Sequence, residues 1–320
     1  MNKRYTPLLL VAYKRVDVLK HSLSALQKCV GLNDRLVFAY LDGARSSVDE
    51  TGIAEVYKMF LMFKETFCPQ LRIVRREKNL GCRGNITQAI SELINQFGRL
   101  IIVEDDIVVS RYFLQYMDEA LDVYRDDKRI WGINAWRNRF AKVPDSYTKD
   151  VYLHQRNMCW GWGTWADRWN AVDFDMEYWP IFKKDPRKIT QLNSVSPFLF
   201  DMLESQYIGN LKTWDVQCSL HIVNEDMYCI EPRYCMTRNC GCEGGHGAEH
   251  FTSADSAIAT QPFYNFMPRL ETDLRPNEEM EKNLGLSDFN PSIMIRCWRK
   301  FLREFWRLGF AADEPRDVKR

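Results

Sequence analysis

Three consecutive carboxylates follow an apolar run in the first third of the chain. The run Leu100–Val103 leads directly into Glu104, Asp105 and Asp106. Adjacent carboxylates repel one another unless a cation neutralises them, and Mg²⁺ and Mn²⁺ bind through one or two protein carboxylates together with phosphate and water oxygens. One hypothesis is therefore a divalent-metal site at Asp106. The other is an acidic helix start, because Asp and Glu favour first turns.

The elements around this triplet alternate between short apolar runs and segments with helical spacing. Strands are predicted at 8–12, 36–41, 71–74 and 100–103, and helices at 16–28, 53–67, 85–97 and 113–124. This alternation predicts an α/β fold with a mainly parallel sheet and helices on both faces. Ligands bind such sheets beyond the carboxyl ends of the strands. Because Arg15, Asp42 and Asp106 each follow a predicted strand, we expect them at one edge of the sheet.

The second half of the chain has a different composition. Residues 131–240 are rich in Trp, Tyr and Cys and lack long periodic segments, which predicts a mixed sheet with long loops on an acceptor side. Within it, Met158–Trp165 places three tryptophans between glycines. Glycine lets a backbone approach a ligand on which indole rings can stack, so Gly161 and Trp162 are candidates for a sugar pocket. An aromatic core with tight turns explains the same pattern.

Composition narrows the class of protein. The chain has 320 residues, a net charge of +1 and a pI of about 7.5, so it can form a large core but has no global basic field for nucleic acid. The first apolar run stops at Lys14, too early for a signal sequence or a membrane span. We therefore expect a cytoplasmic protein with reduced cysteines. The spacing of Cys229, Cys235, Cys240 and Cys242 lacks the pairing typical of zinc sites.

The C-terminal part shows two patterns. Residues 265–292 are polar and contain proline, and we expect an extended linker there. Residues 293–310 carry apolar side chains on one side and basic ones elsewhere, which predicts an amphipathic helix. Such a helix docks on the main domain or lies on a membrane surface, and the latter would favour a lipid-linked acceptor.

Several motifs, taken in order, resemble the inverting N-acetylglucosaminyltransferase I family and related bacterial sugar transferases. The matching segments are Leu9–Arg15, Tyr40–Asp42, Val103–Asp106 with Ile133–Trp136, Thr213–Asp215, and Ile230–Arg233 followed by Gly244–Gly247. The resemblance covers about residues 7–250. It implies a GT-A fold, one divalent ion (Mn²⁺ or Mg²⁺) and inversion at the anomeric carbon. It also implies a nucleotide-sugar-binding half at 1–130, an acceptor-binding half at 131–264, and 265–320 as linker and helix.

The resemblance assigns roles on the donor side. Asp106 would be the direct metal ligand, while Glu104 and Asp105 would orient waters, the ribose or the groups around the ion. Arg15 would contact the nucleotide and Asp42 its base.

On the acceptor side, the resemblance makes Asp215 the general base that takes a proton from an acceptor hydroxyl. Trp214 beside it offers an apolar face for a sugar ring. Asp201, Glu204 and Asp226 lie nearby in the sequence and are rival bases.

Two further residues are candidates for binding phosphate. Arg83, in the glycine-containing segment before the third predicted helix, could pair with a phosphate, although a simple helix-start turn explains the segment too. His246 lies among glycines and could contact the diphosphate or the metal, or could simply be solvated.

The leading hypothesis is an inverting hexosyl- or N-acetylhexosaminyltransferase. It would move a sugar from a nucleotide-sugar, UDP-linked by analogy, to a glycan or lipid-linked acceptor. A sugar-nucleotidyltransferase is the first alternative, although Ala12–Arg15 lacks the glycines that such enzymes carry after their first strand. A non-catalytic carbohydrate-binding protein and a retaining transferase also stay open.

Overall fold

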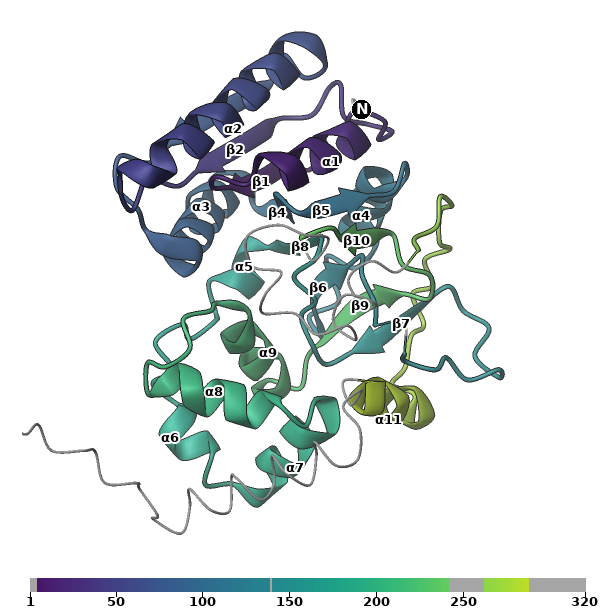
Figure 1. Ribbon diagram of the computed structural model, residues 1–320. Helices are drawn as coiled ribbons and strands as arrows, with labels where there is room; N and C mark the ends of the chain where they lie inside the picture. Colours follow the sequence, from purple (N-terminus) through teal and green to yellow (C-terminus); the bar gives the residue numbers. More distant parts are fainter. Residues whose placement is uncertain (1–4, 139, 242–261, 288–320) are drawn as a thin grey trace, which may run out of the picture. The chain divides into compact units, whose positions relative to one another are not determined.

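The computed structural model describes residues 5–138, 140–241 and 262–287, which are built around one central sheet (Figure 1). The sheet has eight strands in the order β3 (Leu71–Arg75), β2 (Val37–Leu41), β1 (Leu8–Ala12), β4 (Arg99–Glu104), β8 (Trp162–Trp165), β6 (Ile130–Asn134), β9 (Tyr228–Pro232) and β7 (Val151–His154).

Most strands of the sheet run in one direction. β3, β2, β1 and β4 are parallel neighbours, β8 is antiparallel to both β4 and β6, and β9 is parallel to β6. β7 closes the sheet in the opposite direction. The predicted α/β class with a mainly parallel sheet is therefore confirmed, and so is the mixed sheet of the second half. The carboxyl ends of β1, β2, β4, β6 and β9 lie at one edge.

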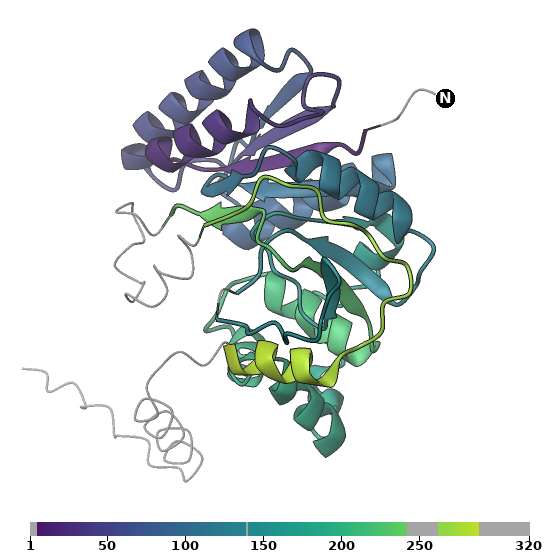
Figure 2. The same cartoon turned by 90° about the vertical axis from the view of Figure 1, so that its right-hand side faces the viewer.

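Helices cover both faces of the first half (Figure 2). α1 (Val16–Leu26) and α2 (Ser47–Thr66) pack on the face that carries Leu8 and Leu10. α3 (Gly81–Phe97) packs on the opposite face, against Leu9 and Val11. Because successive strand residues point to opposite faces, a strand covered on both sides is apolar throughout. This explains the continuous apolar runs in the sequence.

A group of short helices lies in the second half, where long loops were expected. α6 (Trp179–Phe182), α7 (Pro186–Val195), α8 (Leu199–Tyr207) and α9 (Asp215–Asn224) share one apolar cluster, with Trp179, Leu192, Leu203 and Leu220 at its centre. The other side of α9 packs Trp214, Cys218 and Ile222 against the sheet. Isolated helices of this length are marginal in water, so this packing stabilises them.

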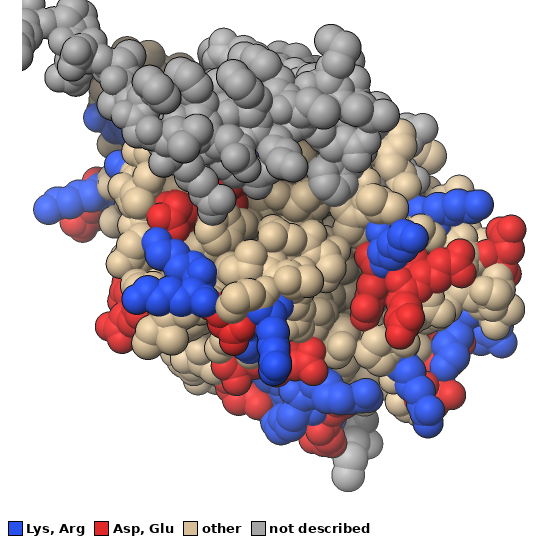
Figure 3. Space-filling model, turned by 90° about the horizontal axis from the view of Figure 1, so that it is seen from below, with Lys and Arg blue, Asp and Glu red and all other residues tan. Residues whose placement is uncertain are grey.

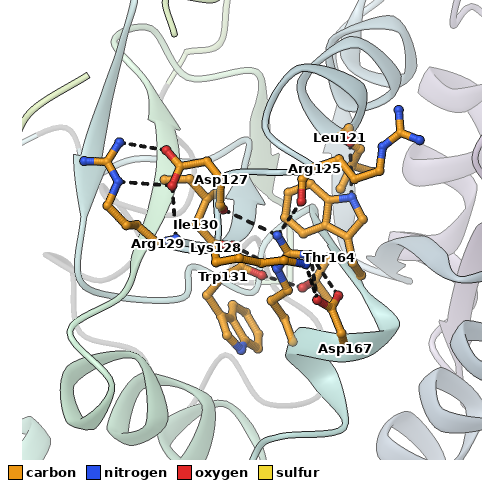
Figure 4. Close-up of polar contacts among 11 residues, drawn as sticks. Leu121, Arg125, Asp127, Lys128, Arg129, Ile130, Trp131, Thr164 and Asp167 are labelled. Carbon is orange, nitrogen blue, oxygen red and sulfur yellow. Dashed lines mark hydrogen bonds and ion pairs between the residues drawn. The ribbon is translucent and has the colours of Figure 1, made fainter. Parts of the chain in front are cut away.

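A buried arginine ties α5 (Ala166–Trp169) to the turn between α4 (Phe113–Val123) and β6, in the region drawn in Figure 4. Arg168 Nε donates to the Ile130 carbonyl at 3.3 Å, and Nη2 donates to the Arg125 carbonyl. Its guanidinium lies 4.5 Å from the Trp165 ring centroid. Arg168 therefore satisfies carbonyls in the turn after α4 and at the first residue of β6.

A two-stranded ribbon lies beside the carboxylate triplet. β5 (Ile107–Val109) follows Asp106 directly and pairs antiparallel with β10 (Thr237–Asn239). The ribbon ends with the Cys240 N–H donating to the Asp106 carbonyl at 2.8 Å. Residues 237–240, which are distant in sequence from the triplet, therefore lie beside it.

A helix, α11 (Glu278–Ser287), lies within the stretch that we expected to be extended. Its Met280 and Leu284 are buried with Ala141 and Tyr152. The expectation of an extended linker is therefore wrong for these residues, since an i, i+4 apolar pair is enough to dock a polar helix. The amphipathic helix predicted at 293–310 lies outside the described residues.

Two findings concern the described surface and its helices. On the face shown in Figure 3, Lys and Arg are interspersed with Asp and Glu rather than gathered into a basic field. In the part of the chain that the structure describes, no helix is both long and apolar enough to cross a bilayer.

Candidate active site

The carboxylate triplet and Arg15 lie together at the carboxyl edge of the sheet. β1 and β4 are parallel neighbours with Val11 opposite Glu104, so the residues that follow the two strands meet. Arg15 Nη2 lies 3.0 Å from Asp106 Oδ2. The same nitrogen donates to Asp105 Oδ1, and Arg15 Nε lies 3.4 Å from Asp105 Oδ2. One guanidinium therefore joins two of the three carboxylates.

The three carboxylates lie close together and are largely shielded from solvent. Burial, together with the neighbouring Asp106 and Asp105, raises the pKa of Glu104 well above its usual value. Burial also raises the pKa of Asp105 to about 6, although the Arg15 guanidinium opposes this shift. Burial alone would lower the pKa of Arg15, but Asp105 and Asp106 raise it, so the guanidinium stays charged. Three carboxylates facing one guanidinium leave negative charge that a divalent cation would neutralise.

The residues at the triplet fit a divalent ion that is held partly by the protein and partly by phosphate or water oxygens. A Cβ added to Gly241 would lie 2.6 Å from Asp106 Oδ2 and 3.2 Å from Arg15 Nη1, so only a glycine leaves this space open. Across residues 5–138, 140–241 and 262–287, no three His, Cys, Asp or Glu side chains converge to hold a metal by themselves. An ion at Asp106 would therefore need phosphate or water oxygens as well, which is the usual arrangement for Mg²⁺.

Asp215 begins α9 and lies near the triplet. Its charge contributes to the raised pKa of Glu104. Thr213 Oγ1 donates to Asp215 Oδ1, while the Thr213 N–H donates to Gln206 Oε1 at 2.9 Å. Asp215 is therefore close enough to Glu104 for its charge to act there, and Thr213 fixes one of its oxygens.

Two of the rival carboxylates are engaged elsewhere. Glu204 lies 3.0 Å from Lys183 Nζ and accepts a hydrogen bond from Trp179 Nε1 at 2.8 Å. Asp226 accepts one from Gln155 Nε2 at 2.9 Å. Asp201 lies in the first turn of α8.

Two cysteines that sequence reasoning missed also lie near the carboxylates. Desolvation and the nearby carboxylates of Glu104 and Asp215 raise the pKa of the Cys82 thiol, although the residue itself is exposed on α3. Burial and Asp215 likewise raise the pKa of Cys159 well above its usual value. Both pKa shifts favour the uncharged thiols. The glycine-containing segments in which they lie are the only sequence signal for them.

Asp42 caps a helix. Its Oδ1 accepts from the Leu80 N–H at 2.8 Å, and its Oδ2 accepts from the Gly81 N–H at 2.9 Å and from Asn79 Nδ2 at 3.0 Å. These are the first N–H groups of α3, which has no cap from its own N-terminal residue. Asp42 therefore has a structural role at the start of α3, and its contact with the nucleotide base stays a prediction; α3 begins four residues before its predicted start.

Arg83 and Gly161 also have structural partners. Arg83 Nη2 donates to the Phe174 carbonyl at 2.7 Å, which ties α3 to a loop of the second half. Gly161 has a φ of +86°, and a Cβ there would lie 2.9 Å from Thr237 Cγ2. A turn and close packing therefore require this glycine. His246 lies outside the described residues.

The two tryptophans expected to face sugars lie in the core. Trp162 is 0% exposed and Trp214 is 2% exposed, with their rings stacked at a centroid distance of 5.3 Å. Trp162 also stacks on Trp131 at 5.6 Å. Neither ring has a face open to a ligand, so both expectations are corrected to an aromatic core. Trp162 packs in one cluster with Ile90 of α3, Trp169 of α5 and Cys218 of α9, so helices cover this face of β8.

Comparisons with known proteins give partial structural likenesses. No protein-family model and no curated protein sequence matches the chain. The crystal structure of S. aureus TarS gives a TM-score of 0.35 at 12% identity over 53% of this chain and 30% of that one. The mannosyltransferase PcManGT from Pyrobaculum calidifontis, in complex with GDP-Man and Mn²⁺, gives a TM-score of 0.35 at 11% sequence identity. This alignment covers 52% of this chain and 46% of that one. The chain therefore aligns with less than half the length of either protein.

Proposed function

We propose that this chain is an inverting glycosyltransferase that moves a sugar from a nucleotide-sugar to a glycan or lipid-linked acceptor. The observation that carries the proposal is the meeting of Arg15 and three carboxylates at the carboxyl edge of the sheet, with Asp215 beside them. Open α/β sheets bind ligands at this edge. A UDP-sugar is the expected donor, with Mn²⁺ or Mg²⁺ as the ion.

The donor end of the site is built from Asp106 and Arg15. Asp106 would hold the divalent ion, which when bound would neutralise charge on the departing diphosphate. Arg15 lies within hydrogen-bonding reach of the same carboxylates, and its planar fork also suits phosphate oxygens. Once another cation neutralises Asp106, the guanidinium can turn to a phosphate. Asp105 keeps the surrounding potential negative, whereas the raised pKa of Glu104 reduces the charge that this residue contributes.

The acceptor end is Asp215. Thr213 holds Oδ1, and Oδ2 is the oxygen left to accept a proton from an acceptor hydroxyl. As that proton leaves, the acceptor oxygen forms a bond to the anomeric carbon. The bond from this carbon to the diphosphate oxygen breaks with its electron pair. One displacement of this kind inverts the configuration.

The test is release of nucleoside diphosphate from a panel of UDP-, GDP- and dTDP-sugars, with and without Mn²⁺. We expect one donor to be turned over by the wild type, and Asp106→Asn to abolish this release. Asp215→Asn should lower kcat with acceptor by about 10²–10⁴-fold and leave donor binding nearly unchanged.

The matched control is Asp34→Asn, because Asp34 is an exposed aspartate distant in sequence from the site. It should behave as the wild type does. If no donor binds or turns over in any metal, the transferase proposal fails and a carbohydrate-binding protein becomes the better account. A reaction that instead joins a sugar phosphate to a nucleoside triphosphate would identify a nucleotidyltransferase.

A further inference from the structure

Three aromatic side chains meet on the described surface beyond β9. Tyr234 is 39% exposed and Tyr264 is 48% exposed, with ring centroids 5.1 Å apart. Phe266 lies 5.4 Å from Tyr234 in an edge-to-face arrangement. Single exposed apolar side chains are ordinary for a soluble protein, whereas these three rings contact one another. A contacting group of this kind needs an explanation.

Main-chain contacts hold this group in place. The Tyr264 N–H donates to the Cys235 carbonyl at 2.8 Å, and Asn265 Oδ1 accepts from the Arg111 N–H at 2.9 Å. Arg233 lies 5.7 Å from the Tyr234 ring centroid and donates through Nη1 to the Tyr147 carbonyl at 2.7 Å. The rings are therefore positioned before any ligand arrives, which lowers the entropic cost of binding.

Further aromatic residues connect this group with the candidate active site. The carbonyl of the half-buried Trp160 accepts a hydrogen bond from Thr237 Oγ1 at 2.7 Å, and Thr237 begins β10, which pairs with the β5 strand that follows Asp106. Trp160 lies 4.6 Å from Trp136 in an edge-to-face contact. Phe263 packs on the same small cluster as Trp160, and it directly precedes Tyr264.

We call Trp160, Phe263, Tyr264, Tyr234 and Phe266 the aromatic strip. Its first member, Trp160, is bonded to the ribbon that follows Asp106, and its last members lie beyond the carboxyl end of β9. The chain from Gly241, at Asp106, back to Tyr234 has seven steps and spans at most about 23 Å at roughly 3.3 Å per residue.

We propose that the aromatic strip binds the saccharide chain of the acceptor, beyond the ring that carries the reacting hydroxyl. The inference rests on the proposed transferase function and specifies its acceptor as an oligosaccharide. Sugar rings present C–H faces that pack on aromatic faces, while tyrosine hydroxyls can hydrogen-bond to sugar hydroxyls. The aromatic strip would therefore supply the apolar face for acceptor sugar rings that was expected of Trp214, which is buried.

The test is direct binding of defined oligosaccharides to the full-length chain without donor. Cellotetraose and chitotetraose, with glucose and N-acetylglucosamine as their single-ring counterparts, are titrated by calorimetry and ligand-observed NMR. We expect at least one tetrasaccharide to bind more tightly than its monosaccharide. Tyr234→Leu and Tyr264→Leu should each weaken it about three- to tenfold, because leucine keeps apolar area but lacks a ring face.

The control is Tyr207→Leu, because Tyr207 is a similarly exposed tyrosine on α8 that lies under Lys183 and outside the strip. It should bind as the wild type does, and the thermal midpoint of every variant checks folding. Failure of both tetrasaccharides to bind the wild type, or unchanged binding by the Tyr234 and Tyr264 variants, overturns the proposal.

Donor turnover by the wild type, measured without acceptor, distinguishes failure of the transferase proposal from failure of the proposal for the aromatic strip. Turnover without oligosaccharide binding rejects the strip and leaves the transferase. Oligosaccharide binding that depends on the strip, without turnover of any donor, rejects the transferase and keeps a saccharide site.

Discussion

At the scale of single residues, the site depends on how Arg15 and the carboxylates share charge. The sequence places an arginine after β1 and three acids after β4, and the rule for parallel strands predicts that they meet. It does not predict that Arg15 pairs with Asp105 as well as Asp106, because that choice depends on side-chain rotamers. Nor does it predict that Asp42 faces helix N–H groups, since the start of α3 is fixed only in the fold.

Arg15→Gln should destabilise the metal-free protein. The change leaves two partly buried carboxylates without their guanidinium, at a cost of roughly 1–3 kcal/mol after allowing for the partial exposure of Arg15. Mn²⁺ should restore more stability to this variant than to the wild type, because the ion supplies the missing charge. Thermal unfolding with and without Mn²⁺ measures both effects.

Lys14→Gln is the matched control for this prediction, since Lys14 is the adjacent cation but pairs with Asp49. Mn²⁺ should not rescue it more than the wild type. Equal rescue of both variants would mean that Arg15 and the ion do not act on the same carboxylates.

Asp105 should make stability depend on pH in the acidic range. Its folded-state pKa is raised to about 6, above an unfolded value of about 3.9, so the folded protein binds the proton more tightly. The resulting stabilisation is present below about pH 4 and is lost as pH rises through 6, by an amount of order 1–3 kcal/mol. We therefore expect the free energy of unfolding, measured with urea between pH 4 and 7, to fall less steeply with rising pH for Asp105→Asn than for the metal-free wild type. An identical pH slope in both proteins would contradict this.

At the scale of elements, strands were easier to predict than the short helices. β1, β2 and β4 are buried on both faces, so each is an uninterrupted apolar run. α6 to α9 carry no comparable pattern, because each buries only a few residues in a shared cluster. Their existence depends on contacts distant in sequence. α11 escaped prediction for the same reason, although its apolar pair at Met280 and Leu284 was readable.

Asp42→Ala should act on α3 through its cap. It leaves the Leu80 and Gly81 N–H groups without their acceptor, which costs about 0.5–2 kcal/mol in typical helices. Asp42→Asn keeps an acceptor oxygen and should recover part of that loss. The free energy of unfolding for the two variants, with hydrogen exchange at α3, gives the measurement. Full stability of Asp42→Ala, combined with weaker nucleotide binding, would restore a direct role in binding the base.

At the scale of the whole described molecule, the two halves of the chain share one sheet and one aromatic core. β8, from the second half, pairs with both β4 and β6, so it lies between strands from either half. Trp162 on β8 stacks on Trp131 and Trp214 at the centre of this arrangement. The sequence identified this tryptophan segment as unusual, but its burial follows from where β8 inserts, which no local pattern specifies.

Trp162→Ala should therefore destabilise the molecule as a unit. Truncating a fully buried tryptophan typically costs about 3–5 kcal/mol. We expect one cooperative unfolding transition that moves to lower denaturant concentration, whether followed by circular dichroism or by fluorescence. The exposed Tyr207→Ala is a suitable control. A variant of unchanged stability with weaker sugar binding would return Trp162 to the ligand site.

The most direct test of the central claim is calorimetric titration of UDP and GDP into the wild type and Asp106→Asn, each with and without Mn²⁺. If the triplet holds a nucleoside diphosphate through an ion, one nucleotide binds the wild type only when Mn²⁺ is present. Asp106→Asn then weakens that binding by at least about tenfold, which corresponds to about 1.4 kcal/mol. Binding of equal strength without the ion, or undiminished in the variant, would contradict the account.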